Sequence, residues 1–174
     1  MDKIANYVGR PLQWGQTKLL KSEYELTSQD LVVATLRFRS LWGTFATAQS
    51  ADGCWTFKRM GFWQTRATIR PCDSEEEIAT FRNNTWKEGG TLVLPDGREY
   101  LANTNFWQTQ YAFKDEAGDP LIHYRNHGVF RSSAEVTISP QAAELPELPW
   151  MVMLGWYLIV MMQNDSAATA AAAS

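Results

Sequence analysis

The chain has 174 residues, a length that fits one domain. Apolar residues make up 45% of the sequence and charged residues 20%, so we expect a packed core and exclude a disordered chain. The formal net charge of −3 gives no overall attraction to nucleic acid, and no nucleic-acid partner is expected.

A short motif recurs along the chain and indicates an internal repeat. The Phe-Trp-Gln-Thr of residues 62–65 returns at residues 106–109, and the Trp-Gly-Gln-Thr of residues 14–17 is a weaker earlier copy. Two further elements follow in the same order at nearly the same offset. We therefore expect one domain over residues 1–163, with repeat units at about 12–60, 61–104 and 105–140.

The repeat units have the sequence pattern of short β-strands. Ala34, Leu36 and Phe38 alternate with Thr35 and Arg37, and a period of two is typical of a strand with one buried face. The later units show the same alternation, which predicts that a second set of side chains faces inward: Trp63, Thr65, Ala67, Ile69, Trp107, Thr109, Tyr111 and Phe113. With turn residues between the runs, the pattern predicts a mainly β fold: a closed antiparallel barrel of about 11–12 strands.

An apolar run near the C-terminus predicts a helix at about residues 149–163 with no polar face. A barrel of about a dozen strands is too wide to be filled by its own side chains, so we place this helix inside it. The alanine-rich residues 164–174 are expected to be disordered or a frayed helix. The helix residues assigned to the core are Trp150, Leu154, Gly155, Trp156 and Leu158.

The alternative for this run is a membrane tail anchor over residues 148–162. Fifteen helical residues span roughly 22 Å, which is shorter than the ~30 Å hydrocarbon core of a bilayer. No Lys or Arg follows Arg131, so basic residues that anchor a helix end at the membrane surface are missing. Both observations favour the buried helix and a protein that is not integral to the membrane.

The N-terminus and the cysteines favour a cytoplasmic protein. Residues 1–6 lack a basic stretch followed by an apolar core, so no secretory signal is expected. Cys54 and Cys72 are interpreted as small buried hydrophobes in a reducing compartment.

The sequence carries no constellation typical of catalysis or metal binding. His123 and His127 are four residues apart, but on a strand that spacing separates them by roughly 13 Å, too far for one metal ion. No nucleophile motif is present, and Gly89-Gly90 lacks the lysine of a phosphate loop. We therefore expect no enzyme activity, no cofactor and no metal.

Basic side chains are expected on the outer face of the barrel. If Ala67 and Ile69 face inward, then Arg66, Arg70 and Arg82 face outward and form a candidate site for a phosphorylated headgroup or an acidic partner. Arg37, Arg39, Lys18 and Arg125 are expected to face outward in neighbouring units. The alternative is that these residues are ordinary surface charges that balance the acidic residues 73–77.

Several short sequence segments, spread over nearly the whole chain, resemble segments of a known superfamily. They are Val-Ala-Thr-Leu-Arg at residues 33–37, Trp-Thr-Phe-Lys-Arg at 55–59, Gly-Phe-Trp at 61–63, Thr-Asn-Phe-Trp at 104–107, and Leu-Pro-Glu-Leu-Pro at 145–149 before Gly-Trp-Tyr-Leu at 155–158. The chain is similar to the tubby C-terminal, phospholipid scramblase and LURP-one-related superfamily, and to small bacterial proteins of that type.

The resemblance implies a strand repeat closed around a hydrophobic C-terminal helix. Its tubby branch implies phosphoinositide binding through basic side chains, and its scramblase branch implies lipid contact and calcium. The sequence has no Asp-x-Asp calcium loop and no cysteine cluster for palmitoylation, so the scramblase properties do not carry over. We expect a non-enzymatic binding or scaffold module for anionic phospholipid headgroups or a protein partner, in the cytoplasm or peripheral to the membrane.

Overall fold

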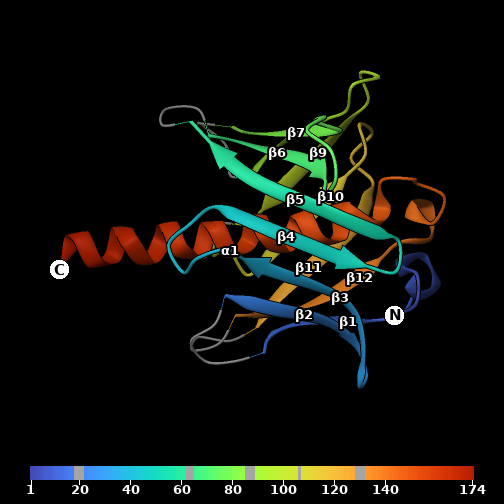
Figure 1. The fold of residues 1–174 in the computed structure, drawn as a ribbon, viewed down its shortest axis with the longest axis horizontal. Coiled ribbons are helices and arrows are strands. Elements are labelled where there is room, and N and C mark those ends of the chain that lie inside the picture. The colour runs from blue at the N-terminus through green and yellow to red at the C-terminus, as the bar shows by residue number, and fades with distance from the viewer. Residues whose placement is uncertain (18–21, 62–64, 85–88, 106, 128–131) are drawn as a thin grey trace.

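The computed structural model describes residues 1–17, 22–61, 65–84, 89–105, 107–127 and 132–174. Within these residues, twelve strands surround one long helix (Figure 1). The elements are a 3-10 turn η1 (Ile4–Tyr7), β1 (Leu12–Gln16), β2 (Glu23–Ser28), β3 (Leu31–Phe38), β4 (Phe45–Ser50), β5 (Gly53–Met60), β6 (Arg66–Pro71), β7 (Ala79–Asn83), β8 (Gly89–Val93), β9 (Glu99–Thr104), β10 (Gln110–Lys114), β11 (Pro120–His127), β12 (Ser133–Ile138), a second 3-10 turn η2 (Pro140–Ala142), and α1 (Leu148–Ala173).

The strands form an antiparallel meander that closes on itself. Each strand pairs with its neighbours in the chain, and β1 pairs with β12 from Leu12 opposite Val136 to Gly15 opposite Ser133. Closure leaves no sheet edge exposed along the barrel wall. The predicted fold class is confirmed, with β1–β5, β6–β9 and β10–β12 lying in the three repeat units in turn.

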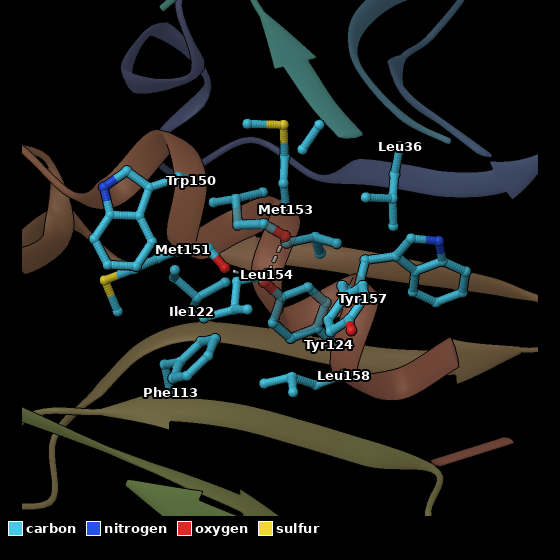
Figure 2. Packing of buried hydrophobic residues seen from close by; sticks show 14 of the residues in the cluster. Leu36, Phe113, Ile122, Tyr124, Trp150, Met151, Met153, Leu154, Tyr157 and Leu158 are labelled. Atoms are coloured by element: carbon cyan, nitrogen blue, oxygen red, sulfur yellow. Dashed lines mark hydrogen bonds between the residues drawn. The ribbon is translucent and has the colours of Figure 1, made fainter. Parts of the chain in front are cut away.

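The barrel lumen is filled by the first half of α1 (Figure 1). Every residue from Trp150 to Met161 is buried, including the five helix residues expected in the core. Inward residues of the strands pack around them, among them Leu36, Phe113 and Ile122 (Figure 2). A helix with no polar face is stable here because the barrel covers it on all sides.

The helix is longer than the sequence predicts. It begins at Leu148 and ends at Ala173, and the residues from Asn164 onward are exposed beyond the barrel (Figure 1). Alanine has the highest helix propensity, so the alanine-rich segment continues the helix that the barrel holds.

Gly155 leaves room for a side chain of a strand to pack closely against the helix. A β-carbon at this position would overlap the ring and hydroxyl of Tyr124, which extends from β11 against α1 (Figure 2). The Tyr124 hydroxyl donates a hydrogen bond of 2.8 Å to the carbonyl of Val152. The close approach therefore satisfies the hydroxyl of a fully buried tyrosine.

Cys54 and Cys72 form a disulfide, so their interpretation as unlinked buried cysteines is wrong. Trp55 and Pro71 are register partners in the β5–β6 pair, which brings the adjacent cysteines opposite each other with Cα atoms 5.4 Å apart. That separation is within the normal range for a disulfide.

Two residues expected on a strand lie in a turn instead. Trp107 and Thr109 precede β10, which begins at Gln110, and both are exposed. Asn105 holds this turn because its side-chain oxygen accepts the backbone N–H groups of Thr109 and Gln110 at 2.8 and 3.0 Å. Trp63 and Lys18, whose directions were also predicted, lie outside the described residues.

Candidate binding surface at the exit end

The course of α1 defines two ends of the barrel. At the base, where α1 begins, Arg98 forms an ion pair of 2.6 Å with Glu147. At the exit end, where α1 leaves, Arg59 pairs with Asp165, and Ser132 donates a hydrogen bond to Gln163. Because the strands are antiparallel, successive connections lie alternately at the base and the exit end.

Charge is distributed unevenly between these ends. The connections at the base carry Asp30, Asp52, Asp73, Glu75, Glu76, Glu77, Asp96, Asp115, Glu116 and Asp119, with Arg70, Arg98 and Lys114 as nearby basic residues. The strand ends at the exit carry Arg39, Lys58, Arg59, Arg66 and Arg82 among the described residues, with Glu23, Glu25, Glu135 and Asp165 as nearby acids. Such an asymmetry attracts anions to the exit end and repels them from the base.

Arg66 and Arg82 are direct cross-strand neighbours at the exit end. They are register partners in the β6–β7 pair, and both are exposed. Within the described residues neither guanidinium forms an ion pair. Like charges directly opposite each other destabilise a sheet. An anion bound between the two guanidinium groups would therefore relieve their repulsion.

Arg70 is on the same strand but lies toward the base. Its guanidinium pairs with Glu75 at 3.0 Å and with Glu77 at 2.9 Å. Four residues along a strand correspond to roughly 13 Å, so Arg70 does not share a site with Arg66. The structure thus brings together two of the three arginines predicted to converge, and places the third against the acidic residues 73–77.

Other outward arginines also have acidic partners. Arg37 lies 3.3 Å from Glu23, and Arg125 lies 2.8 Å from Glu135. Exposed pairs of this kind contribute little to stability, about 1 kcal/mol or less, but they neutralise the local charge. Arg39 resembles Arg66 and Arg82, because it is exposed and forms no ion pair with any described residue.

Large apolar side chains are exposed on the same end. Trp42, in the β3–β4 connection, is 95% exposed, and Trp107, in the β9–β10 connection, is 77% exposed. Exposed tryptophans on a surface that also carries arginines are typical of surfaces that bind a partner.

Where the structure describes the chain, no group of three or more His, Cys, Asp or Glu residues is arranged so that it could hold a metal ion. His123 and His127 both lie on β11. Burial lowers the pKa of His123, and the nearby Arg125 adds to this effect. Gly90 sits where a β-carbon would meet the backbone of Arg82 and the ring of Phe81, which gives it a packing role in β8.

The sequence did not single out Glu147, a carboxylate that is only 3% exposed. Tyr100 donates a hydrogen bond to it, and Arg98 pairs with the same oxygen. Burial and the hydrogen bond to Glu147 raise the pKa of Tyr100, so the phenol stays neutral. This cluster ties the start of α1 to β9, and no motif reveals it because its members are far apart in sequence.

The fold has a counterpart among solved structures. A protein from Arabidopsis thaliana, determined by X-ray crystallography, superposes with a TM-score of 0.54 at 9% identity, over 92% of this chain and 96% of that chain. At this identity the similarity shows the fold alone. A scan against protein-family models finds no match, and a search of curated proteins finds none. Among the described residues, no helix combines the length and apolarity needed to cross a bilayer.

Proposed function

We propose that this barrel is a non-enzymatic binding module that takes an anionic group, in the first place a phosphorylated lipid headgroup, at its exit end. The observation that carries the proposal is the Arg66–Arg82 pair, two exposed guanidinium groups opposite each other without a carboxylate partner in the described chain. A phosphate between them would accept charge-assisted hydrogen bonds from both and remove their mutual repulsion.

The surroundings support an anionic ligand that approaches along the barrel axis. Arg39 and Lys58 add positive charge at the exit end, while the acidic connections lie at the base. The exposed Trp42 and Trp107 on this end suit a membrane interface, where indole rings are favoured at headgroup level.

Membership of the tubby, scramblase and LURP-one-related superfamily belongs to the same proposal. It is supported by the barrel closed around a C-terminal helix and by the sequence phrases that resemble the superfamily. A phosphoinositide headgroup, as the tubby branch implies, is the first ligand to test.

The cytoplasmic location stays a prediction that the disulfide opposes. Disulfides persist mainly in oxidising compartments, and Cys54–Cys72 would be reduced in most cytosols. Alkylation of thiols in freshly lysed cells, followed by mass measurement, decides the point: two alkyl groups per chain would support the cytoplasm, and none an oxidising compartment.

Vesicle sedimentation tests the headgroup site. We expect binding to phosphatidylcholine vesicles that contain phosphatidylinositol bisphosphate, little binding to phosphatidylcholine alone, and weaker binding at higher salt. Arg66→Glu with Arg82→Glu should abolish the difference. Arg37→Glu with Arg125→Glu changes the net charge equally and is the matched control, because both of these arginines already have acidic partners. Equal loss in both double variants, or no binding of the unaltered protein, would contradict the proposal.

A protein partner is the second candidate, favoured by a groove beside Trp42. The groove has a volume of about 330 Å³ and lies between the β3–β4 connection and the exposed part of α1, with Leu41, Met161 and Ala168 among its lining residues. The tail-anchor alternative has no comparable support, because residues 150–161 are buried in the barrel. Cross-linking from position 168, which lines the same groove, to a cellular protein, lost when Trp42→Ser is added, would favour the partner.

A further inference from the structure

A cavity lies inside the exit end, between α1 and strands β5, β7, β8 and β10. Its volume is about 230 Å³, and its apolar walls are formed by Phe81, Tyr111, Leu158, Met161 and Met162. It is separate from the Arg66–Arg82 pair, because these arginines are on the outer face and do not line it.

The volume admits a small organic molecule. An apolar cavity of about 150 Å³ in another protein is large enough to bind benzene. A cavity of about 230 Å³ therefore accepts one substituted ring or a short aliphatic chain. A ligand that is polar over its whole surface would lose hydrogen bonds to water against these apolar walls, so such ligands are excluded.

Tyr111 provides a polar group in an otherwise apolar wall. The residue is 2% exposed, and its ring packs against Phe113 and Tyr124. Among the described residues no hydrogen bond from its hydroxyl to another protein group is found, and this hydroxyl is not one of the fully enclosed polar atoms that lack a partner. A hydroxyl of a cavity-lining residue that has no protein partner is available to donate a hydrogen bond to a ligand oxygen or nitrogen. Burial raises the pKa of Tyr111, so the phenol remains a donor at neutral pH.

The polar rim of the cavity carries no net charge. Arg59 donates to both carboxylate oxygens of Asp165, at 2.6 and 3.0 Å, and the pair neutralises itself. Asn83 and Asn84 complete the polar lining with uncharged amides. A ligand anion would lie near the Asp165 carboxylate, and a ligand cation near the Arg59 guanidinium, so both are disfavoured.

We propose that this cavity binds a small uncharged molecule with an apolar ring or short chain and a single hydrogen-bond acceptor that pairs with the Tyr111 hydroxyl. This site is independent of the anionic headgroup site and would stand if that site failed.

Four probes of similar shape test the proposal: cyclohexanone, methylcyclohexane, cyclohexanecarboxylate and cyclohexylammonium. Methyl signals of labelled methionines provide the readout, because Met161 and Met162 line the cavity whereas Met151 and Met153 lie deeper in the barrel. We expect cyclohexanone to shift the Met161 and Met162 signals and leave the other two in place. One hydrogen bond should make it bind about fivefold more tightly than methylcyclohexane, with both charged probes weaker.

Tyr111→Phe keeps the ring and removes the hydroxyl. Cyclohexanone should then bind no better than methylcyclohexane, whereas Tyr24→Phe, in a buried tyrosine that does not line the cavity, should leave the preference intact. The Arg66→Glu and Arg82→Glu double variant should also retain it. The absence of any shift at Met161 and Met162 with all four probes would overturn the proposal, as would a preference for cyclohexanone that persists in Tyr111→Phe.

Discussion

The two halves of α1 have the same secondary structure and opposite surroundings. From Trp150 to Met161 every residue is buried, and from Asn164 to Ala173 every residue is exposed. The inner half has bulky side chains and the outer half is mostly alanine. One continuous helix is thus stabilised in two ways, by burial inside the barrel and by intrinsic propensity outside it.

Specific contacts from several strands hold the inner half. Trp156 stacks on Trp14 of β1 with ring centroids 5.9 Å apart, and Tyr157 stacks on Phe38 of β3 at 5.5 Å. The Tyr157 hydroxyl also donates to the carbonyl of Thr44 at 2.5 Å. The outer half contacts the barrel through exposed polar side chains, mainly the Arg59–Asp165 pair. The barrel and the inner half therefore depend on each other, while the outer half depends on the inner half.

The largest expected effect comes from a carboxylate placed in the inner half. Leu154→Asp should prevent folding, because burying an unpaired charge costs several kcal/mol and the whole domain is stabilised by only about 5–15 kcal/mol. Leu158→Asp should be less severe, since Leu158 borders the exit-end cavity. Ala170→Asp, on the exposed half, is the matched control and should melt like the unaltered protein. Thermal unfolding followed by circular dichroism measures all three, and a soluble, cooperatively melting Leu154→Asp protein would contradict the placement of the helix.

Gly155 provides a sharper test, because two effects predict opposite signs. Helix propensity alone predicts that Gly155→Ala adds about 1 kcal/mol of stability. Overlap with the Tyr124 ring predicts a loss of about 1–3 kcal/mol, and a larger loss for Gly155→Leu. We expect Gly155→Ala to lower the free energy of unfolding, as measured by urea denaturation.

A second variant tests the cause of that loss. Tyr124→Leu removes the ring that a β-carbon would meet, so Gly155→Ala should be better tolerated in this background than alone. Equal costs of Gly155→Ala in both backgrounds would show that the ring is not responsible.

The features that the sequence predicted follow from local periodicity and composition. Alternation in residues 34–38 assigned Leu36 and Phe38 to the lumen, and the absence of a polar face assigned the apolar helix to the same place. These patterns depend on neighbouring residues, so one sequence suffices to reveal them.

The features that the sequence missed depend on register between distant residues. The Cys54–Cys72 disulfide requires the β5–β6 alignment, and the burial of Glu147 requires Arg98 and Tyr100 to reach it from β9. In the sequence pattern, Arg70 is equivalent to Arg66, because both face outward on the same strand. In the structure, the turn that carries Glu75 and Glu77 pairs with Arg70 alone. Trp107 followed the alternation of β10, but the Asn105 turn ends that alternation before the strand begins. Ion pairs and turns of this kind are set by geometry that composition does not encode.

Buried tyrosines around the inner half predict a loss of stability at high pH. Burial raises the pKa values of Tyr111, Tyr124 and Tyr157 above their usual value near 10. Above pH 10 the unfolded chain therefore loses phenol protons that the folded chain keeps, so the free energy of unfolding falls as pH rises. Each such tyrosine contributes about 1.4 kcal/mol per pH unit in that range. Urea midpoints measured from pH 8 to pH 11 should show this decline, with a shallower slope in Tyr111→Phe; a flat profile would contradict the burial of these phenols.

The smallest effect is expected from removing the outer half of α1. Truncation after Gln163 deletes Asp165 and the exposed alanines, and it removes the ion pair with Arg59. Because Asp165 is 57% exposed, this pair should contribute about 1 kcal/mol or less. An isolated helix of this length is marginal in water, so the outer half forms only as an extension of the inner half and returns little stability to it. We therefore expect a weaker helical signal in circular dichroism at low temperature but nearly the same melting temperature. Ala170→Gly should weaken that signal alone, by fraying the last turns. A truncated chain that melts much earlier would show that the outer half supports the barrel, and the two halves would then form one cooperative unit.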